Sequence, residues 1–109
     1  MIDGNIWAEI QIKTTLKNEI GESAEYWQTV DKVWGWLDLQ SGDSKYTNYD
    51  TKMQESTHIF VSDYKALDKR IKAKNSRLIV DGEIYDVMLI DNPMNLNKQL
   101  EIYLKYTGD

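Results

Sequence analysis

The chain has 109 residues, with 13 basic and 18 acidic side chains, a net charge of -5, one histidine and no cysteine. This length suits one domain over residues 1–109, and the composition excludes a disulfide framework and a Cys/His zinc site. The negative charge disfavours tight wrapping of nucleic acid by the whole surface. No apolar run reaches the roughly 20 residues of a membrane-spanning helix and no early segment resembles a signal peptide. We therefore expect a soluble, unsecreted protein without a metal or cofactor.

The first part of the chain predicts two strands joined by a turn. Residues 6–13 alternate between apolar and polar side chains, which is typical of a half-buried β-strand. Residues 20–25 are turn-like, and a second extended segment covers residues 27–39. The apolar face of the first strand carries Ile6, Ala8, Ile10 and Ile12, whereas Trp7 falls on its polar face.

The second predicted strand contains two tryptophans on one face. Alternation places Trp34 and Trp36 opposite the aliphatic residues Val33 and Leu37. Tryptophan is enriched at binding hot spots, so this face is either covered by the following segment or exposed for a partner. Gly35 between the tryptophans has no side chain, which marks a bulge or the close approach of another backbone.

The strongest local prediction is a hairpin in the second half of the chain. Residues 56–62 alternate again, and residues 77–80 and 83–90 then flank Asp81-Gly82. Such a pair favours the positive-φ turn of a two-residue hairpin. The hairpin ends at Asp91-Asn92-Pro93, because proline cannot donate a hydrogen bond to a sheet.

The last predicted strand covers residues 99–106, with Leu100, Ile102 and Leu104 inward and Tyr103 outward. About six short strands with little helix indicate an all-β fold, either a small antiparallel β-barrel or a sandwich, since closure removes exposed sheet edges. At most one or two short helical segments are expected, and they would lie in the two long connections, residues 41–55 and 63–76.

Both long connections are candidate functional segments. In residues 41–55 the large side chains recur at helical spacing, which predicts a short helix or a segment that orders against a partner; they are Tyr46, Tyr49 and Met53. Residues 63–76 are rich in basic side chains, which form either a solvated loop or a patch that contacts an acidic partner or DNA. The candidates for such a contact are Lys69, Arg70, Lys72 and Lys74.

No catalytic constellation is recognisable, and we expect that the chain is not an enzyme. His58 has no nucleophile in a suitable motif near it. The carboxylates near the hairpin are best explained as a solvated outer face; they are Asp81, Glu83, Asp86 and Asp91.

The order of these features resembles the head-tail joining proteins of tailed bacteriophages and prophages, also called head-closure or stopper proteins. The resemblance covers residues 27–106. Its marks are the strand Val33-Trp34-Gly35-Trp36-Leu37 leading to Ser41-Gly42, the strand His58-Ile59-Phe60-Val61, Arg77 before Gly82-Glu83-Ile84-Tyr85, and Asp91-Asn92-Pro93 before a final amphipathic strand.

The resemblance implies a β-barrel subunit that assembles as a dodecameric ring beneath the portal and its adaptor. The ring would continue the DNA channel, help to retain packaged double-stranded DNA and dock the tail. It would assemble in the host bacterial cytoplasm and remain in the virion, and residues 41–55 would face the channel or a neighbouring subunit. The expected interface residues are Trp34, Trp36, Tyr46, Tyr49 and Met53.

An alternative from another class remains open. An OB-like or SH3-like binding module would stack single-stranded nucleic acid, or another polymer, on its aromatic side chains beside the basic segment. Salt-dependent binding of an oligonucleotide would favour this module, and ring formation with a portal-adaptor complex would favour the connector.

Overall fold

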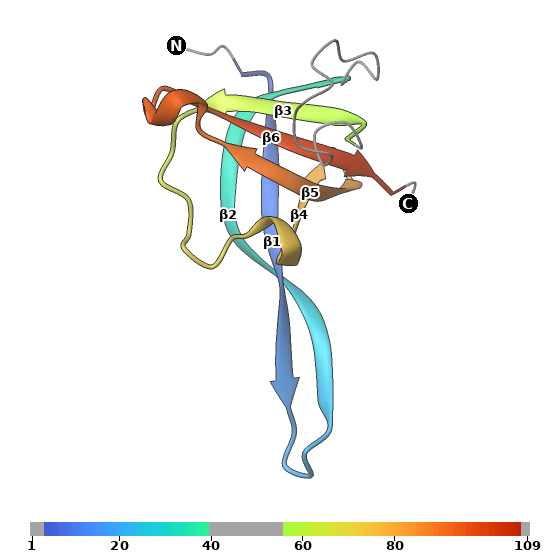
Figure 1. The fold of residues 1–109 in the computed structure, drawn as a ribbon. Coiled ribbons are helices and arrows are strands. Elements are labelled where there is room, and N and C mark those ends of the chain that lie inside the picture. Colours follow the sequence, from blue (N-terminus) through green and yellow to red (C-terminus); the bar gives the residue numbers. More distant parts are fainter. Residues whose placement is uncertain (1–3, 40–55, 108–109) are drawn as a thin grey trace.

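The computed structural model describes residues 4–39 and 56–107, which form a closed barrel of six antiparallel strands (Figure 1). The strands are β1 (Ile6–Lys17), β2 (Ser23–Leu39), β3 (His58–Asp63), β4 (Ser76–Val80), β5 (Glu83–Asp91) and β6 (Gln99–Tyr106). Their order is β1-β2-β3-β6-β5-β4, and β4 closes the barrel on β1. The only helical segments in these residues are two short 3-10 turns, η1 (Ala73–Asn75) and η2 (Pro93–Asn95). The structure therefore confirms the all-β class and selects the barrel over the sandwich.

The core of the barrel comes from every second residue of its strands, as the alternation predicts. The side chains that lose essentially all their solvent exposure are Ala8, Ile10, Phe60, Leu78, Ile102 and Leu104. Burial of this apolar row is the main force that holds the sheet closed, because each strand contributes one face to a common interior. None of the helical segments in the described part of the chain is long and apolar enough to cross a membrane.

Gly35 lets the backbones of β2 and β3 approach each other closely. A Cβ atom on this residue would lie 2.0 Å from the carbonyl oxygen of Val61 and 2.9 Å from Cε1 of Phe60. Gly35 pairs in regular register with Ile6 on one side and Ser62 on the other. Of the two predicted explanations for this glycine, the close approach of another backbone is correct and the bulge is wrong.

Strands β1 and β2 continue beyond the barrel as a long two-stranded arm (Figure 1), and the molecule measures 52 × 29 × 27 Å. The turn at its end is built by Asn18, whose Oδ1 accepts hydrogen bonds from the backbone N–H groups of Ile20 and Glu22. Gly21 supplies the positive φ of 85° that this turn needs. The predicted start of the second strand at residue 27 is therefore wrong, because β2 begins at Ser23.

A bulge in β2 changes which residues face outward. The register shifts between Ile10 and Gln11, which pair with Asp31 and Thr29, so Val30 has no opposite residue. One extra residue moves all following side chains to the other face. Trp27 before the bulge and Trp34 after it therefore both point away from the barrel interior.

The predicted hairpin between β4 and β5 is confirmed. Asp81 and Gly82 have φ values of 51° and 79°, as the two-residue turn requires. In the last strand, Tyr103 lies on the outer face but retains only 7% of its exposure. Burial and the nearby charge of Glu101, which accepts a hydrogen bond from its hydroxyl at 3.2 Å, raise the pKa of Tyr103 to about 12. This side chain is therefore covered rather than solvated.

Candidate interaction surface

Two tryptophans form an exposed aromatic pair on the outer wall of the barrel. Trp7 on β1 lies directly opposite Trp34 on β2, and their ring centroids are 5.2 Å apart at an angle of 57°. The exposed fractions are 58% for Trp7 and 43% for Trp34. Large aromatic groups with this exposure are typical of contact surfaces, because their apolar area is available for burial by a partner.

The N-terminal segment supports one side of this pair. A Cβ atom on Gly4 would lie 2.5 Å from Cδ1 of Trp34, so this segment packs closely on the indole. Residues 41–55, the other segment that was expected to cover Trp34 and Trp36, lie outside the described residues, as do the interface candidates Tyr46, Tyr49 and Met53.

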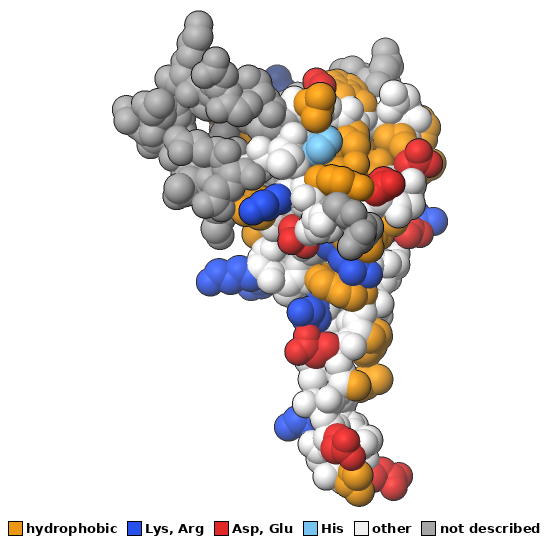
Figure 2. Space-filling model, turned by 90° about the vertical axis from the view of Figure 1, so that its right-hand side faces the viewer, with side chains coloured by type: hydrophobic (Ala, Val, Ile, Leu, Met, Phe, Trp, Pro, Cys, Tyr) orange, Lys and Arg blue, Asp and Glu red, His pale blue; other side chains and the backbone are white. Residues whose placement is uncertain are grey.

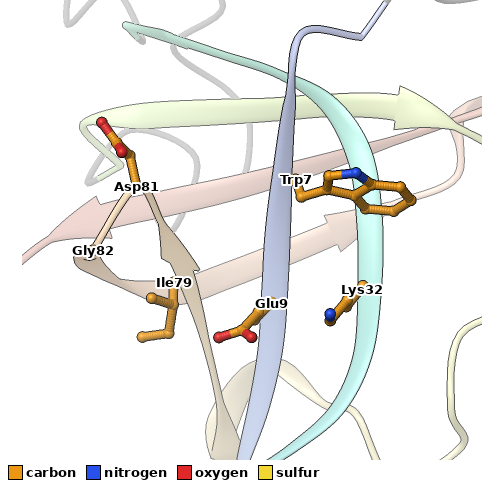
Figure 3. A pocket seen from close by; sticks show the side chains of 6 residues that line it. All are labelled: Trp7, Glu9, Lys32, Ile79, Asp81 and Gly82. Atoms are coloured by element: carbon orange, nitrogen blue, oxygen red, sulfur yellow. The ribbon is translucent and has the colours of Figure 1, made fainter.

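A hollow of about 410 Å³ adjoins the tryptophan pair (Figure 3). Glu9 on β1 lies between Ile79 on β4 and Lys32 on β2, so the hollow combines an apolar wall with charges of both signs. Its lining residues are Trp7, Glu9, Lys32, Ile79, Asp81 and Gly82. This chemistry suits a protein side chain, because it offers apolar contact and orienting charges.

The other sequence-predicted tryptophan, Trp36, also faces outward, since it alternates with Leu37, which packs against the core. It is half-buried and pairs with Val61 on β3. Neither Trp34 nor Trp36 belongs to the buried core. Trp7 was missed as a contact residue, and its place on the polar face of the first strand was the available signal.

Two cations lie close to the ring of Trp27 on the outer face of the barrel. The guanidinium of Arg77 lies 4.2 Å from the centre of its ring, and Nζ of Lys13 lies 5.5 Å from it. Arg77 also donates a hydrogen bond from Nε to Oε1 of Gln11 at 2.8 Å. Desolvation lowers the pKa of Arg77, although the charge of Asp86 opposes this shift. Arg77 therefore fixes the root of the arm to β4.

The basic segment between β3 and β4 is partly neutralised by Asp31 on β2. Its carboxylate binds the ammonium group of Lys65 and accepts a hydrogen bond from the backbone N–H of Asp68 at 3.0 Å. Burial opposes the charge of Asp31, but the hydrogen bonds from Lys65, Asp68 and Lys32 together lower its pKa. This carboxylate pins the connection to the barrel wall, 37 positions away in the chain.

The four predicted basic contacts do not behave alike. Arg70 folds back on Asp68, donating from Nε at 3.0 Å and from a terminal nitrogen at 2.9 Å, and these bonds lower the pKa of Asp68 to about 2. Lys69, Lys72 and Lys74 are exposed, and no described acidic side chain forms an ion pair with them. Of the four predicted contacts, these three lysines are therefore the ones whose charge is not paired with a described acidic group.

His58 lies among aromatic rings. Its ring meets Tyr85 edge-on at 5.1 Å and Tyr106 at 6.2 Å, and its Nδ1 lies 2.8 Å from Oγ1 of Thr57. Within residues 4–39 and 56–107, no group of three or more His, Asp or Glu side chains is arranged to hold a metal ion.

Solved structures share this fold over nearly the whole chain. The solution structure of protein SF1141 from Shigella flexneri 2a is 19% identical, with a TM-score of 0.72, and the match covers 97% of this chain and 95% of that one. A chain in the virion of a native gene transfer agent particle is 14% identical, with a TM-score of 0.60 and coverage of 95% and 94%. At these identities the likeness shows the fold alone, and no curated protein matches the chain.

The sequence itself matches a family model described as phage head completion protein. The match spans residues 7–105, from Trp7 on β1 to Lys105 on β6, and so takes in residues of all six strands of the barrel. The chain therefore belongs to the phage head completion protein family.

Proposed function

We propose that this structural protein is a connector subunit that forms a ring between the head and the tail of a phage or prophage particle. The ring continues the DNA channel below the portal and its adaptor, helps to retain packaged DNA and docks the tail. Family membership supports the place in the particle. The observation that carries the contact role is the exposed Trp7–Trp34 pair, since a subunit of an assembly needs apolar surface that its own fold leaves uncovered.

The charge distribution suits a conduit for DNA. The chain has a net charge of -5, and its basic segment is partly neutralised by Asp31 and Asp68. Strong phosphate binding would hold the duplex in place, because each neutralised phosphate adds salt-dependent affinity. Weak contact through exposed lysines of this segment such as Lys69 positions the DNA without stopping its passage.

The interface includes Trp34 and Trp36 on the barrel wall and extends to the segment that contains Tyr46, Tyr49 and Met53. The partners are neighbouring copies in a dodecameric ring, the portal-adaptor above and tail proteins below. Assembly takes place in the host cytoplasm, and the subunit stays in the finished virion as a single barrel domain.

Deleting the gene from a particle-producing strain tests this function. We expect filled heads without tails, some of which have lost their DNA, and recovery of complete particles when the intact gene is supplied. Electron microscopy of the purified particles measures the tailed fraction. Normal numbers of tailed particles in the deletion strain would contradict the proposal. Tight, salt-dependent oligonucleotide binding by the purified chain would instead favour the nucleic-acid module.

A further inference from the structure

The two faces of the arm differ in chemistry. One face is charged, with Lys13 opposite Trp27 and Lys17 opposite Ser23, and an ion pair of 3.1 Å joins Lys13 to Glu25. The other face continues the inward row of β1 past the end of the barrel. It consists of Thr14 opposite Tyr26 and Leu16 opposite Ala24.

On the arm this inward face has no core to cover it. Leu16 is 59% exposed and Tyr26 is 41% exposed. Figure 2 shows hydrophobic side chains along one side of the arm down to its end, where they lie beside acidic groups. A two-stranded ribbon alone in water is only marginally stable. An uncovered apolar face on such a ribbon therefore indicates a partner that packs against it.

The tip of the arm has a defined chemical character. Ile20 is 78% exposed, the highest value for any large hydrophobic side chain on the arm. It lies between Glu19 and Glu22 in the turn, and neither carboxylate forms an ion pair with another described residue. The tip thus presents one branched apolar side chain flanked by two negative charges.

The barrel carries a hollow with the complementary character. Its volume is about 190 Å³, and it is lined by Ala73 and Lys74 of η1 and by Val87 and Met88 of β5. The floor is apolar, Lys74 lines the hollow, and Lys72 directly precedes η1. Both lysines are exposed and have no described acidic partner. Such a site fits a branched apolar side chain with carboxylates beside it.

The tip and the hollow of one copy lie far apart, because the tip ends the arm and η1 lies against the barrel (Figure 1). We propose that Ile20 of one copy docks in this hollow of the next copy, with Glu19 and Glu22 facing Lys72 and Lys74. Two different surfaces meet in this contact, so it is head-to-tail and generates a ring when the rotation closes. The inference rests on the proposed connector function and names the contact between its copies.

Engineered cysteines test this contact, because the chain has none of its own. The double variant Ile20→Cys with Lys74→Cys is expected to form a disulfide ladder of this chain up to the closed ring, in concentrated protein and in particles. The control pairs Lys17→Cys with Lys74→Cys and places its thiol on the charged face of the arm, so it should give no ladder. An equal ladder from the control, no ladder from the test pair, or cross-linking of position 20 to a different virion protein would overturn the inference.

Charge reversal gives an independent test, because all four charged residues are exposed. Glu19→Lys with Glu22→Lys, or Lys72→Glu with Lys74→Glu, should lower ring formation at least tenfold, and combining all four should restore it. Sedimentation of the full chain measures the ring, and circular dichroism checks the fold. Normal ring formation by both reversed variants would overturn this contact. Tail attachment in the same variants would still support the connector function. Tailed particles without the gene would instead remove the connector function itself.

Discussion

Replacing Trp34 with alanine separates a contact role from a core role. Its 43% exposure leaves a little more than half of the residue covered, by Trp7 and the segment at Gly4. Covered indole area of roughly 100 Å² at about 25 cal/mol per Å², reduced for residual burial in the unfolded chain, gives about 2 kcal/mol. Phe60→Ala, in contrast, should cost about 4 kcal/mol because Phe60 is 0% exposed.

Urea unfolding followed by circular dichroism measures both losses, and electron microscopy of complemented particles measures tail attachment. We expect Trp34→Ala to remain folded but to reduce the tailed fraction about tenfold, equivalent to roughly 1.4 kcal/mol of lost contact energy. Met94→Ala is the matched control, because Met94 is 87% exposed and lies in η2, between β5 and β6. A loss of 4 kcal/mol or more in stability, or normal tail attachment, would refute the reasoning.

Three further predictions follow from individual contacts. Gly35→Ala should lower the free energy of unfolding by about 3 kcal/mol or more in urea, because its Cβ would lie 2.0 Å from a carbonyl oxygen. Gly21→Ala should cost only about 1 kcal/mol, because a Cβ there would have nothing within 4 Å. Equal losses in the two variants would contradict this reasoning. Arg77→Lys should cost about 1 kcal/mol through lost stacking on Trp27, and additivity with Trp27→Phe in a double-mutant cycle would argue against the contact. The pKa of Tyr103, about 12, exceeds the unfolded value of about 10, so its stabilising effect is complete below pH 10 and is lost as the pH rises through 12. Tyr103→Phe should remove this loss of stability at alkaline pH. An ultraviolet titration in which Tyr103 ionises at the same pH as the exposed tyrosines would contradict the prediction.

The sequence predicted an all-β fold, either a barrel or a sandwich, because its strands follow simple local rules. Alternation identified the inward rows, and Asp81-Gly82 marked the hairpin, because each signal lies within a few residues. The family resemblance rested on the same local motifs, and the match over residues 7–105 confirms it.

The arm could not be predicted, because its strands do not surround a core. Residues 14–17 and 23–26 contain few apolar side chains, and they pair with each other beyond the barrel. Their apolar face becomes visible only when Leu16 is placed opposite Ala24. The bulge at Val30 was equally hidden, since pairing register depends on the partner strand.

Two features of the candidate surface depend on contacts between distant residues. Trp7 joins Trp34 only through the register of β1 and β2. Asp31 neutralises part of the basic segment from a different strand, so a count of lysines and arginines overstated the available charge. Local sequence gives the type of each side chain but not its neighbour across the sheet.

A reconstruction of the head-to-tail junction by electron cryomicroscopy tests the central claim most directly. We predict a closed ring of this barrel between the portal-adaptor and the tail, with the Trp7–Trp34 pair in contact with another subunit. The absence of the chain from the junction, or its presence elsewhere in the particle, would contradict the account.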